Sequence, residues 1–164
     1  MAVYNPDLKR SHQPPVVPTM AINVIMSELV KPTKATPQIP FWLSNLDLGA
    51  RNSYTPMIYL FRTHSNDNQG FFSPDVLKTA LGNALVPFYP LAGRLSVALD
   101  GRVEINCNAK GAVFTVARSD VVLDDLEGFM PSKEMCDMFV PPYEKEAGVG
   151  SPLLLLQVRL HFAL

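Results

Sequence analysis

The amino-acid sequence predicts a mixed α/β fold, because one amphipathic helical segment lies among several short apolar runs of strand length. Leu77, Leu81 and Leu85 recur every four residues, which is typical of a helix with one buried face. Apolar runs bounded by proline, glycine or polar turns indicate the strands. At 164 residues, the chain is long enough for one hydrophobic core and not for two.

Upstream of the helix, the sequence predicts two strands joined by a loop. The first strand covers residues 22–30. Residues 37–48 are predicted to form a loop in which Phe41 and Trp42 make a hydrophobic contact. The second strand, at 57–62, is apolar at nearly every position, so we expect burial on both of its faces.

Ser73 is predicted to cap the start of the helix, because its hydroxyl can accept a hydrogen bond from a free backbone amide. Pro74 fits the first helical position, and the Asp75 carboxylate complements the positive end of the helix dipole. The leucine stripe faces the core, so Lys78 and Asn83 are expected in water.

A hairpin follows the helix, and its register can be predicted from the side-chain pattern. A three-residue loop ending in a left-handed Gly101 pairs Val97 with Val103 and Leu95 with Ile105. A two-residue loop would instead mix apolar and charged residues on one face. We therefore predict the three-residue loop, with one face of the hairpin in the core.

The remaining elements complete the predicted fold. Arg94 and Arg102, which begin the two hairpin strands, are expected near solvent. A strand is predicted at 112–117, followed by short helices at 121–129 and 132–140. A final strand covers 153–160. If its edge were uncovered, its leucines would be a template for self-association or for pairing with a longer relative.

Composition limits the possible functions. The net charge of −1 gives no electrostatic footprint for nucleic acid or for an anionic membrane, and no apolar stretch approaches the length of a membrane span. Cys107 and Cys136 form no CxxC pair and no disulfide framework, which is typical of a reducing compartment, so we expect a cytoplasmic protein. Residues 1–19 are predicted to be a mobile tail before a single domain at 20–164.

Four segments in order carry a family resemblance: WLSNLDL at 42–48, VPFYPLAGRL at 86–95, DGRVEI at 100–105 and SPLLLLQV at 151–158. The chain resembles the plant BAHD acyltransferases, and most of all the hydroxycinnamoyl-CoA:shikimate/quinate transferases and their amine-acylating relatives. This resemblance implies transfer of a hydroxycinnamoyl-type acyl group to an alcohol or amine. It implies acyl-CoA as co-substrate and no bound cofactor. The implied fold is the chloramphenicol-acetyltransferase-like α/β sandwich, of which this chain would hold an incomplete N-terminal domain.

The resemblance also implies substrate-binding residues. In the hydroxycinnamoyl transferases, the segment resembling residues 54–59 lines the acyl and acceptor pocket. It implies a substrate-binding role for Tyr54, Thr55, Met57 and Tyr59. Thr55 and Tyr59 match the family pattern, whereas Met57 stands where those enzymes often have Ser, and Tyr54 where they often have His. A thioether cannot donate the hydrogen bond of a hydroxyl, so the usual shikimate preference is not assured. The alternative is that all four are residues of a buried strand.

No catalytic residue is predicted in these 164 residues. The family takes its general base from the His of an HxxxD motif and has a second, structural DFGWG motif, and neither occurs here. His12, His64 and His161 have no spacing of a metal site or of a catalytic triad. The acidic residues from 120 to 127 are predicted to be a solvated loop.

Two functions therefore remain open. The first is an acyl-CoA-dependent transferase whose chain ends before HxxxD and is inactive alone. The second is a non-catalytic half-domain that acts as an interaction or regulatory protein.

Overall fold

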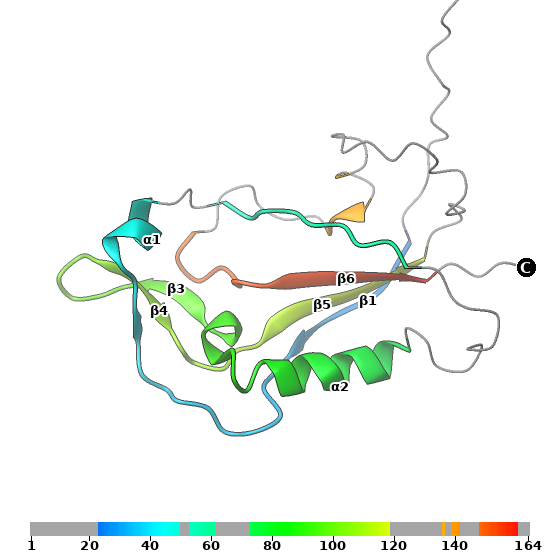
Figure 1. Cartoon of the computed structure of the whole chain (residues 1–164), viewed down its shortest axis with the longest axis horizontal. Coiled ribbons are helices and arrows are strands. Elements are labelled where there is room, and N and C mark those ends of the chain that lie inside the picture. The colour runs from blue at the N-terminus through cyan, green and yellow to red at the C-terminus, as the bar shows by residue number, and fades with distance from the viewer. Residues whose placement is uncertain are drawn as a thin grey trace, which may run out of the picture.

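The structure is a computed structural model that describes residues 23–49, 53–61, 73–118, 136, 139–141 and 148–160. Within these residues, two three-stranded sheets lie end to end along the longest axis of the molecule (Figure 1). The strands are β1 (Asn23–Val30), β2 (Phe41–Trp42), β3 (Arg94–Val97), β4 (Val103–Asn106), β5 (Ala112–Arg118) and β6 (Leu155–Leu160). The helices are α1 (Asn45–Gly49), α2 (Pro74–Ala84) and the 3₁₀ helix η1 (Tyr89–Ala92).

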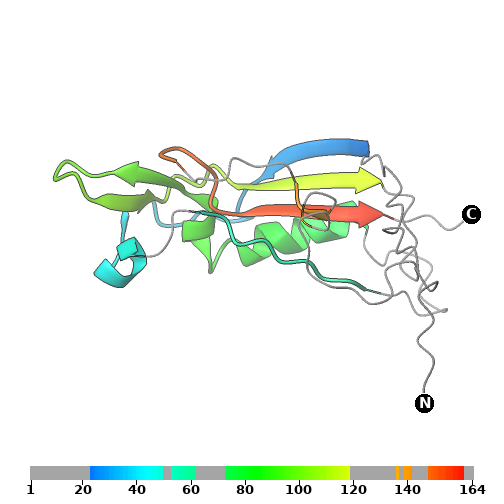
Figure 2. The ribbon, with the colours of Figure 1, turned by 90° about the horizontal axis from the view of Figure 1, so that it is seen from above.

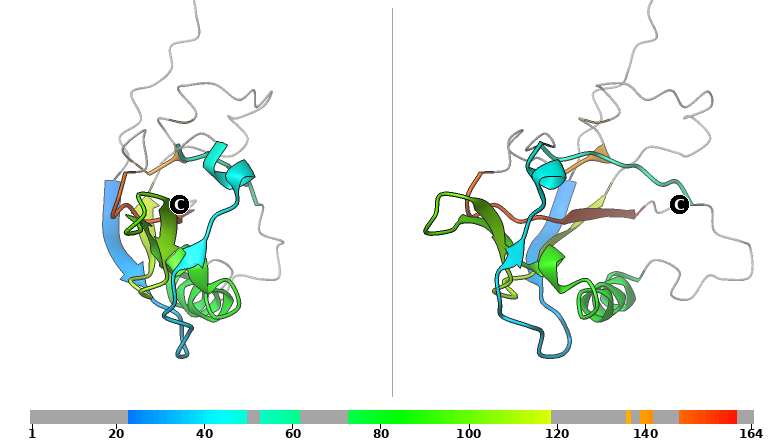
Figure 3. Two further views of the ribbon diagram at one scale, coloured as in Figure 1. Left: turned by 90° about the vertical axis from the view of Figure 1, so that its left-hand side faces the viewer. Right: turned by 60° about the vertical axis from the view of Figure 1, so that its left-hand side comes forward.

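The first sheet has the order β1-β5-β6, with β5 antiparallel to β1 and parallel to β6. Helix α2 lies against one face of this sheet, as Figures 2 and 3 show from two further sides. The buried core cluster consists of Leu85, Ala92 and Ala112, with Leu81 and Leu154 packed against it. These strands confirm the predictions at 22–30, 112–117 and 153–160 to within two residues at each end.

Helix α2 confirms the predicted start at Pro74 and the predicted buried stripe, because Leu85 is fully buried and Leu77 and Leu81 are half-buried. The predicted side-chain cap is wrong. The Ser73 hydroxyl makes no capping hydrogen bond, and the Ser73 carbonyl instead accepts a bond from the Leu77 amide.

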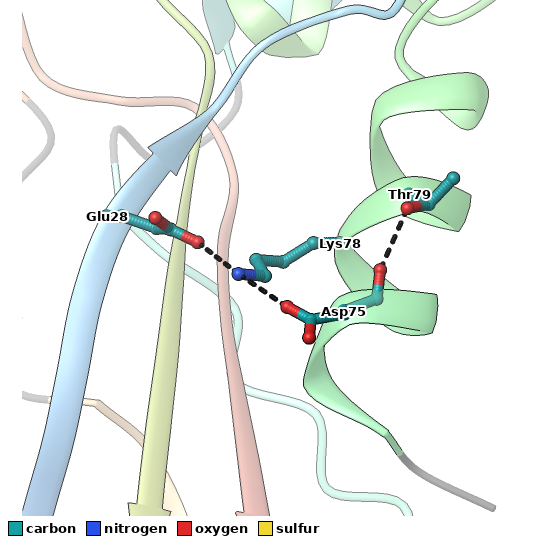
Figure 4. A network of polar contacts seen from close by, with 4 residues as sticks. All are labelled: Glu28, Asp75, Lys78 and Thr79. Atoms are coloured by element: carbon teal, nitrogen blue, oxygen red, sulfur yellow. Dashed lines mark hydrogen bonds and ion pairs between the residues drawn. The ribbon is translucent and has the colours of Figure 1, made fainter. Parts of the chain in front are cut away.

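The Lys78 side chain is half-buried and ion-paired, whereas the prediction placed it in water. Its Nζ lies 3.0 Å from a carboxylate oxygen of Glu28 on β1 and 3.0 Å from one of Asp75 within the helix (Figure 4). The hydroxyl of Thr79 donates to the Asp75 carbonyl in the same turn. The Lys78 stem is long enough to lie along the helix and bring its charge to the sheet, so α2 is joined to β1 by ion pairs as well as by apolar packing.

The hairpin β3–β4 confirms the predicted register, with Val97 opposite Val103 and Leu95 opposite Ile105. Gly101 has φ of 84° and ends a three-residue loop, since the Ala98 amide donates to the Arg102 carbonyl across it. The local side-chain alternation and one left-handed glycine therefore determine this hairpin.

Arg94 is buried, and the prediction that it lies near solvent is wrong. Its Nη1 donates to the carbonyl oxygens of Gly93 at 2.6 Å and Gly111 at 2.8 Å. Burial lowers the pKa of the guanidinium from its ordinary value. The carbonyls compensate part of the lost hydration, so this charge joins the hairpin to the start of β5.

The prediction of a loop at 37–48 with a hydrophobic contact is wrong in two respects. Phe41 and Trp42 form β2, which pairs with β4, and they are 43% and 64% exposed. The Arg102 guanidinium lies 4.7 Å from the centre of the Trp42 ring, and its Nη2 donates to the Leu43 carbonyl at 2.8 Å. The ring is held by a cation rather than by core packing.

Helix α1 was also part of that predicted loop. The Ser44 hydroxyl accepts a hydrogen bond from the Asp47 amide, and the Asp47 carboxylate accepts one from the Ser44 amide. The pattern is a capping box, which starts a helix from two local side chains. These bonds lower the pKa of the Asp47 carboxyl from its ordinary value.

The predicted buried strand at 57–62 is wrong for the residues that the structure describes. Residues 54–61 are extended but form no strand, with a single bridge residue at Ser53 before them, and Met57 and Tyr59 are 71% and 70% exposed. Both side chains are therefore exposed, although the apolar composition of the segment predicts that they are buried. The predicted tail at 1–19 and the predicted helix at 121–129 lie outside the described residues, as does most of the predicted helix at 132–140.

Candidate functional site

The four residues for which the family resemblance implies a substrate-binding role lie on an extended segment, 53–61, that runs along β6 (Figures 1 and 2). Tyr54 is half-buried, and its hydroxyl donates to the carbonyl of Pro152, just before β6. This hydrogen bond joins two parts of the chain that are 98 residues apart. Pro152 also forms a β-bridge with Arg94 at the start of β3, so the bond fixes the start of the segment at the junction of the two sheets.

Thr55, Met57 and Tyr59 are exposed. The Tyr59 hydroxyl donates to the Met57 sulfur at 3.8 Å, and the Tyr59 ring stacks on Phe61 with 6.4 Å between ring centres. A thioether is a weak acceptor, so this contact leaves the Tyr59 hydroxyl available to a stronger one. The structure thus brings Met57 and Tyr59 together at the surface and holds Tyr54 separately, by its bond to Pro152.

A row of polar side chains crosses the first sheet on the face opposite α2. Ser27 is paired with Thr115, and Thr115 with Gln157, on neighbouring strands. The Ser27 and Thr115 hydroxyls are 3.0 Å apart, and Nε2 of Gln157 donates to the Phe139 carbonyl at 3.0 Å. Because alternate strand residues share a face, Arg159 lies on this side too. We call Ser27, Thr115, Gln157 and Arg159 the polar face.

Arg159 is the most unusual member of the polar face. Its guanidinium lies 4.5 Å from the centre of the Phe139 ring. Its Nε, Nη1 and Nη2 atoms are buried and have no hydrogen-bond partner among the described residues, and the same is true of Oε1 of Gln157. Burial lowers the pKa of Arg159 from its ordinary value. These groups can bind an anion and a hydrogen-bond donor.

The sequence did contain a signal for these two residues. In LLQVRL of β6, Gln157 and Arg159 are two positions apart, so a strand must place both on one face. The preceding leucine run, which predicts burial on both faces, concealed this alternation. Phe139 could not be found in this way, because its position over β6 is a tertiary contact.

Other reactive side chains offer less. Cys107 is buried, and burial raises the pKa of its thiol, which disfavours the nucleophilic thiolate. Both Cys107 and Cys136 are free thiols. In the part of the chain that the structure describes, no cluster of three His, Cys, Asp or Glu side chains could hold a metal ion. The three histidines and the acidic residues from 120 to 127 lie outside it.

No helix in the described ranges is both long enough and apolar enough to cross a membrane.

Comparison with known protein families shows to which family this chain is related. The model of the transferase family, described as "Transferase family", matches residues 20–160. The chain belongs to this family. It is the family of the BAHD acyltransferases, which the four sequence segments resemble.

Individual relatives within the family are plant acyltransferases. The chain is 52% identical to putrescine hydroxycinnamoyltransferase 2 of Oryza sativa subsp. japonica, over 84% of this chain and 44% of that protein. It is 44% identical to shikimate O-hydroxycinnamoyltransferase of Nicotiana tabacum, over 87% of this chain and 32% of that protein. The chain thus spans less than half the length of the relatives it matches.

The fold agrees with a solved member of the family. The crystal structure of vinorine synthase matches with a TM-score of 0.58 and 23% identity, over 86% of this chain and 35% of that one. This match confirms the predicted chloramphenicol-acetyltransferase-like α/β fold, in its N-terminal part.

Proposed function

We propose that this chain supplies the N-terminal part of an acyl-CoA-dependent transferase that moves a hydroxycinnamoyl-type group to an alcohol or amine. The observation that carries the proposal is the family match over residues 20–160, together with 52% identity to a putrescine hydroxycinnamoyltransferase. This evidence favours the transferase over the non-catalytic interaction protein that the sequence left open. Acyl-CoA is the co-substrate in this proposal.

In the proposed reaction, this chain positions the substrates, and a general base outside these residues takes a proton. Acyl transfer needs a base that takes the proton of the acceptor, and the 164 residues contain no HxxxD. In our proposal, the role of this chain is to form the sheet against which the substrates are positioned, with the segment at 53–61 beside them. Positioning alone is worth up to roughly 7–11 kcal/mol of a barrier.

The proposal assigns separate roles within that segment. Tyr54 holds the segment to Pro152 and so acts as a positioning residue. Thr55 and Tyr59 offer exposed hydroxyls to the acyl group, and Met57 packs its thioether against the aromatic ring of that group. These three side chains are available for such contacts because they are exposed.

A chimera tests the proposal. Residues 20–160 would replace the matching segment of rice putrescine hydroxycinnamoyltransferase 1, to which the chain is 46% identical. Thiol release from p-coumaroyl-CoA would be followed with putrescine and with shikimate. We expect activity from the chimera and none above a heat-treated control from the 164 residues alone. An inactive but folded chimera would contradict the proposed function.

The chimera also tests Tyr59. Loss of one neutral hydrogen bond is worth about 0.5–1.5 kcal/mol, so Tyr59→Phe should lower kcat/KM roughly two- to tenfold. Tyr89→Phe, in η1, is the matched control and should leave kcat/KM unchanged. Equal effects of the two substitutions would remove Tyr59 from the substrate site.

We also propose a cellular location and the bounds of the domain. We place the chain in the cytoplasm as a domain at 20–164 that follows a tail at 1–19, on the basis of its cysteine usage and composition. Cell fractionation of tagged protein tests the location, and limited proteolysis tests the domain boundary, since an accessible tail should be removed first.

A further inference from the structure

The polar face contains a charge for which the described residues supply no counter-ion. The three guanidinium nitrogens of Arg159 are buried and without a hydrogen-bond partner there. Removing a charge from water is costly unless an opposite charge and hydrogen bonds replace the lost hydration. Arginine cannot escape this cost by losing its proton. An anion beside Arg159 would therefore be strongly favoured.

The geometry around Arg159 determines the direction from which an anion can approach. The Phe139 ring lies over the guanidinium at 4.5 Å and covers a flat face of this group. The N–H donors of a guanidinium lie in its plane, where a carboxylate accepts two parallel hydrogen bonds. Stacking on Phe139 and bidentate binding of a carboxylate are thus compatible.

Gln157 extends the site by one polar group. Its Nε2 donates to the Phe139 carbonyl, and this bond directs the side chain toward the same residue whose ring covers Arg159. Its Oε1 is buried without a partner among the described residues and can only accept a hydrogen bond. Residues two apart in a strand are separated by roughly 6.6–6.8 Å, so a ligand could reach both groups with an anion and a nearby hydroxyl or amine.

Charge balance favours a carboxylate over a phosphate. A carboxylate carries one negative charge and neutralises one guanidinium. A phosphate near neutral pH carries about −1.5 to −2. It would leave excess charge buried beside the Gln157 carbonyl oxygen, which itself repels anions.

We propose that Gln157, Arg159 and Phe139 form a binding site for a small monocarboxylic acid that carries a hydroxyl or amino group. The carboxylate binds the Arg159 guanidinium in its plane. The hydroxyl or amine donates to Oε1 of Gln157, and the Phe139 ring covers the guanidinium. The site is a property of this chain alone and stands whether or not the proposed acyl transfer is correct.

Isothermal titration of the 164-residue chain with 3-hydroxybenzoate tests the site, with two matched probes. Methyl 3-hydroxybenzoate keeps the hydroxyl and lacks the charge, and benzoate keeps the charge and lacks the hydroxyl. Because a hydrogen bond to a charged group is stronger than a neutral one, we expect roughly ten- to hundredfold weaker binding of the ester. For benzoate, we expect binding about two- to tenfold weaker than for 3-hydroxybenzoate.

Two variants locate the site. Arg159→Gln should weaken binding of 3-hydroxybenzoate roughly ten- to hundredfold. Gln157→Glu should abolish binding and raise the denaturation midpoint, because it places a carboxylate two positions from Arg159 on the same face. Arg118→Gln, at the exposed end of β5, is the control and should bind as the unaltered chain does.

Several outcomes would overturn the proposal. One is no binding of 3-hydroxybenzoate at millimolar concentration, and another is equal binding by the Arg159→Gln variant and the unaltered chain. If Arg159→Gln unfolds the chain, the Gln157→Glu variant still decides, since unaltered binding by that variant places the acid elsewhere. If Arg159→Gln is destabilised and the unaltered chain binds no acid, then the anion beside Arg159 belongs to the polypeptide itself. That result would also overturn the proposal.

Discussion

The two sheets of this chain have the same number of strands, but the central strand of the first sheet and the edge strands of the second differ widely in burial. In the first sheet, Phe114 and Val116 of β5 are 1% and 2% exposed. In the second sheet, Val97 of β3 is 52% exposed and Trp42 of β2 is 64% exposed. Cover by a helix is only part of the cause, because Val24 and Leu29 of the edge strand β1 in the first sheet are 49% and 51% exposed. β5 is buried because it lies between β1 and β6 and because α2 lies against this sheet (Figure 3).

The difference in burial separates two sources of stability. The first sheet is stabilised by apolar area removed from water and by close packing. The second sheet depends on cross-strand pairs, each worth roughly 0.2–1 kcal/mol, and on the contacts of Arg102 with Trp42, Leu43 and Asn45. Substitutions should therefore cost several-fold more in β5, at the centre of the first sheet, than in the edge strands of the second.

The largest expected effect is that of Phe114→Ala at the centre of the first sheet. Removing a fully buried aromatic side chain costs about 3–5 kcal/mol in unfolding free energy, through lost burial and the cavity that remains. Val97→Ala in the second sheet is the control and should cost less than about 1 kcal/mol. Urea denaturation followed by circular dichroism measures both. Similar midpoints for the two variants would show that the sheets do not differ as the burial indicates.

The next effect concerns the turn that leads into the first sheet. Gly111 has φ of 99°, and a Cβ added there would lie 2.5 Å from the Val30 carbonyl oxygen. Gly111→Ala should therefore combine a conformational cost of roughly 1–2 kcal/mol with a backbone clash, for a total above about 2 kcal/mol. The added Cβ would push against Val30 of β1, so the loss of stability should come from weaker β1–β5 pairing.

Gly101→Ala is the matched control, because Gly101 has φ of 84° but open space around its Cα. It should show only the conformational cost. If the two alanine variants unfold at the same urea concentration, the close approach of Gly111 to β1 contributes nothing to stability.

Much of this fold could be predicted because its determinants are local. The hairpin register follows from alternation between Val97 and Val103 and from one left-handed glycine. The strand predicted at 57–62 failed because apolar composition cannot tell a buried strand from an exposed extended segment. The prediction that Arg94 lies near solvent failed because a charged side chain can be buried where carbonyl groups accept its hydrogen bonds. These carbonyls belong to Gly93 and to Gly111, which is distant in sequence.

The candidate site was harder to predict than the fold. The family resemblance directed attention to residues 54–59, and the contact that the structure adds is the hydrogen bond of Tyr54 to Pro152, at the junction of the two sheets. The Gln157 and Arg159 alternation was present in the sequence. Its meaning depended on Phe139, which lies 20 residues from Arg159 in sequence and covers it only after folding. Tertiary contacts of this kind leave no periodic signal.

A smaller effect is expected for Leu81→Ala in α2. Leu81 is half-buried and packs against the core cluster of Leu85, Ala92 and Ala112. Its truncation should cost about 2 kcal/mol, the lower end of the range for leucine, because part of the side chain already contacts water. Val76→Ala, on the same helix and 61% exposed, is the control. An unchanged denaturation midpoint for Leu81→Ala would show that α2 does not stabilise the first sheet by packing.

The smallest effect concerns the ion pairs that join α2 to β1. Asp75, and after it Glu28, raise the pKa of Lys78 above its ordinary value of 10.5, mainly through hydrogen bonds to the ammonium group. A raised pKa in the folded chain means that the pairs stabilise it fully below about pH 10.5, and that this stabilisation is lost as the pH rises through the folded value. Both carboxylates reach solvent, so salt should screen the pairs.

Lys78→Met therefore should lower the urea midpoint slightly at pH 8 and low salt, and the deficit should shrink in 1 M salt. It should shrink again above about pH 10.5, where the unaltered chain loses the same charge. Lys110→Met, in the exposed turn before β5, controls for the loss of a positive charge and should show no such convergence. A Lys78→Met deficit that is constant across pH and salt would mean that the lysine stem, and not its charge, joins the helix to the first sheet.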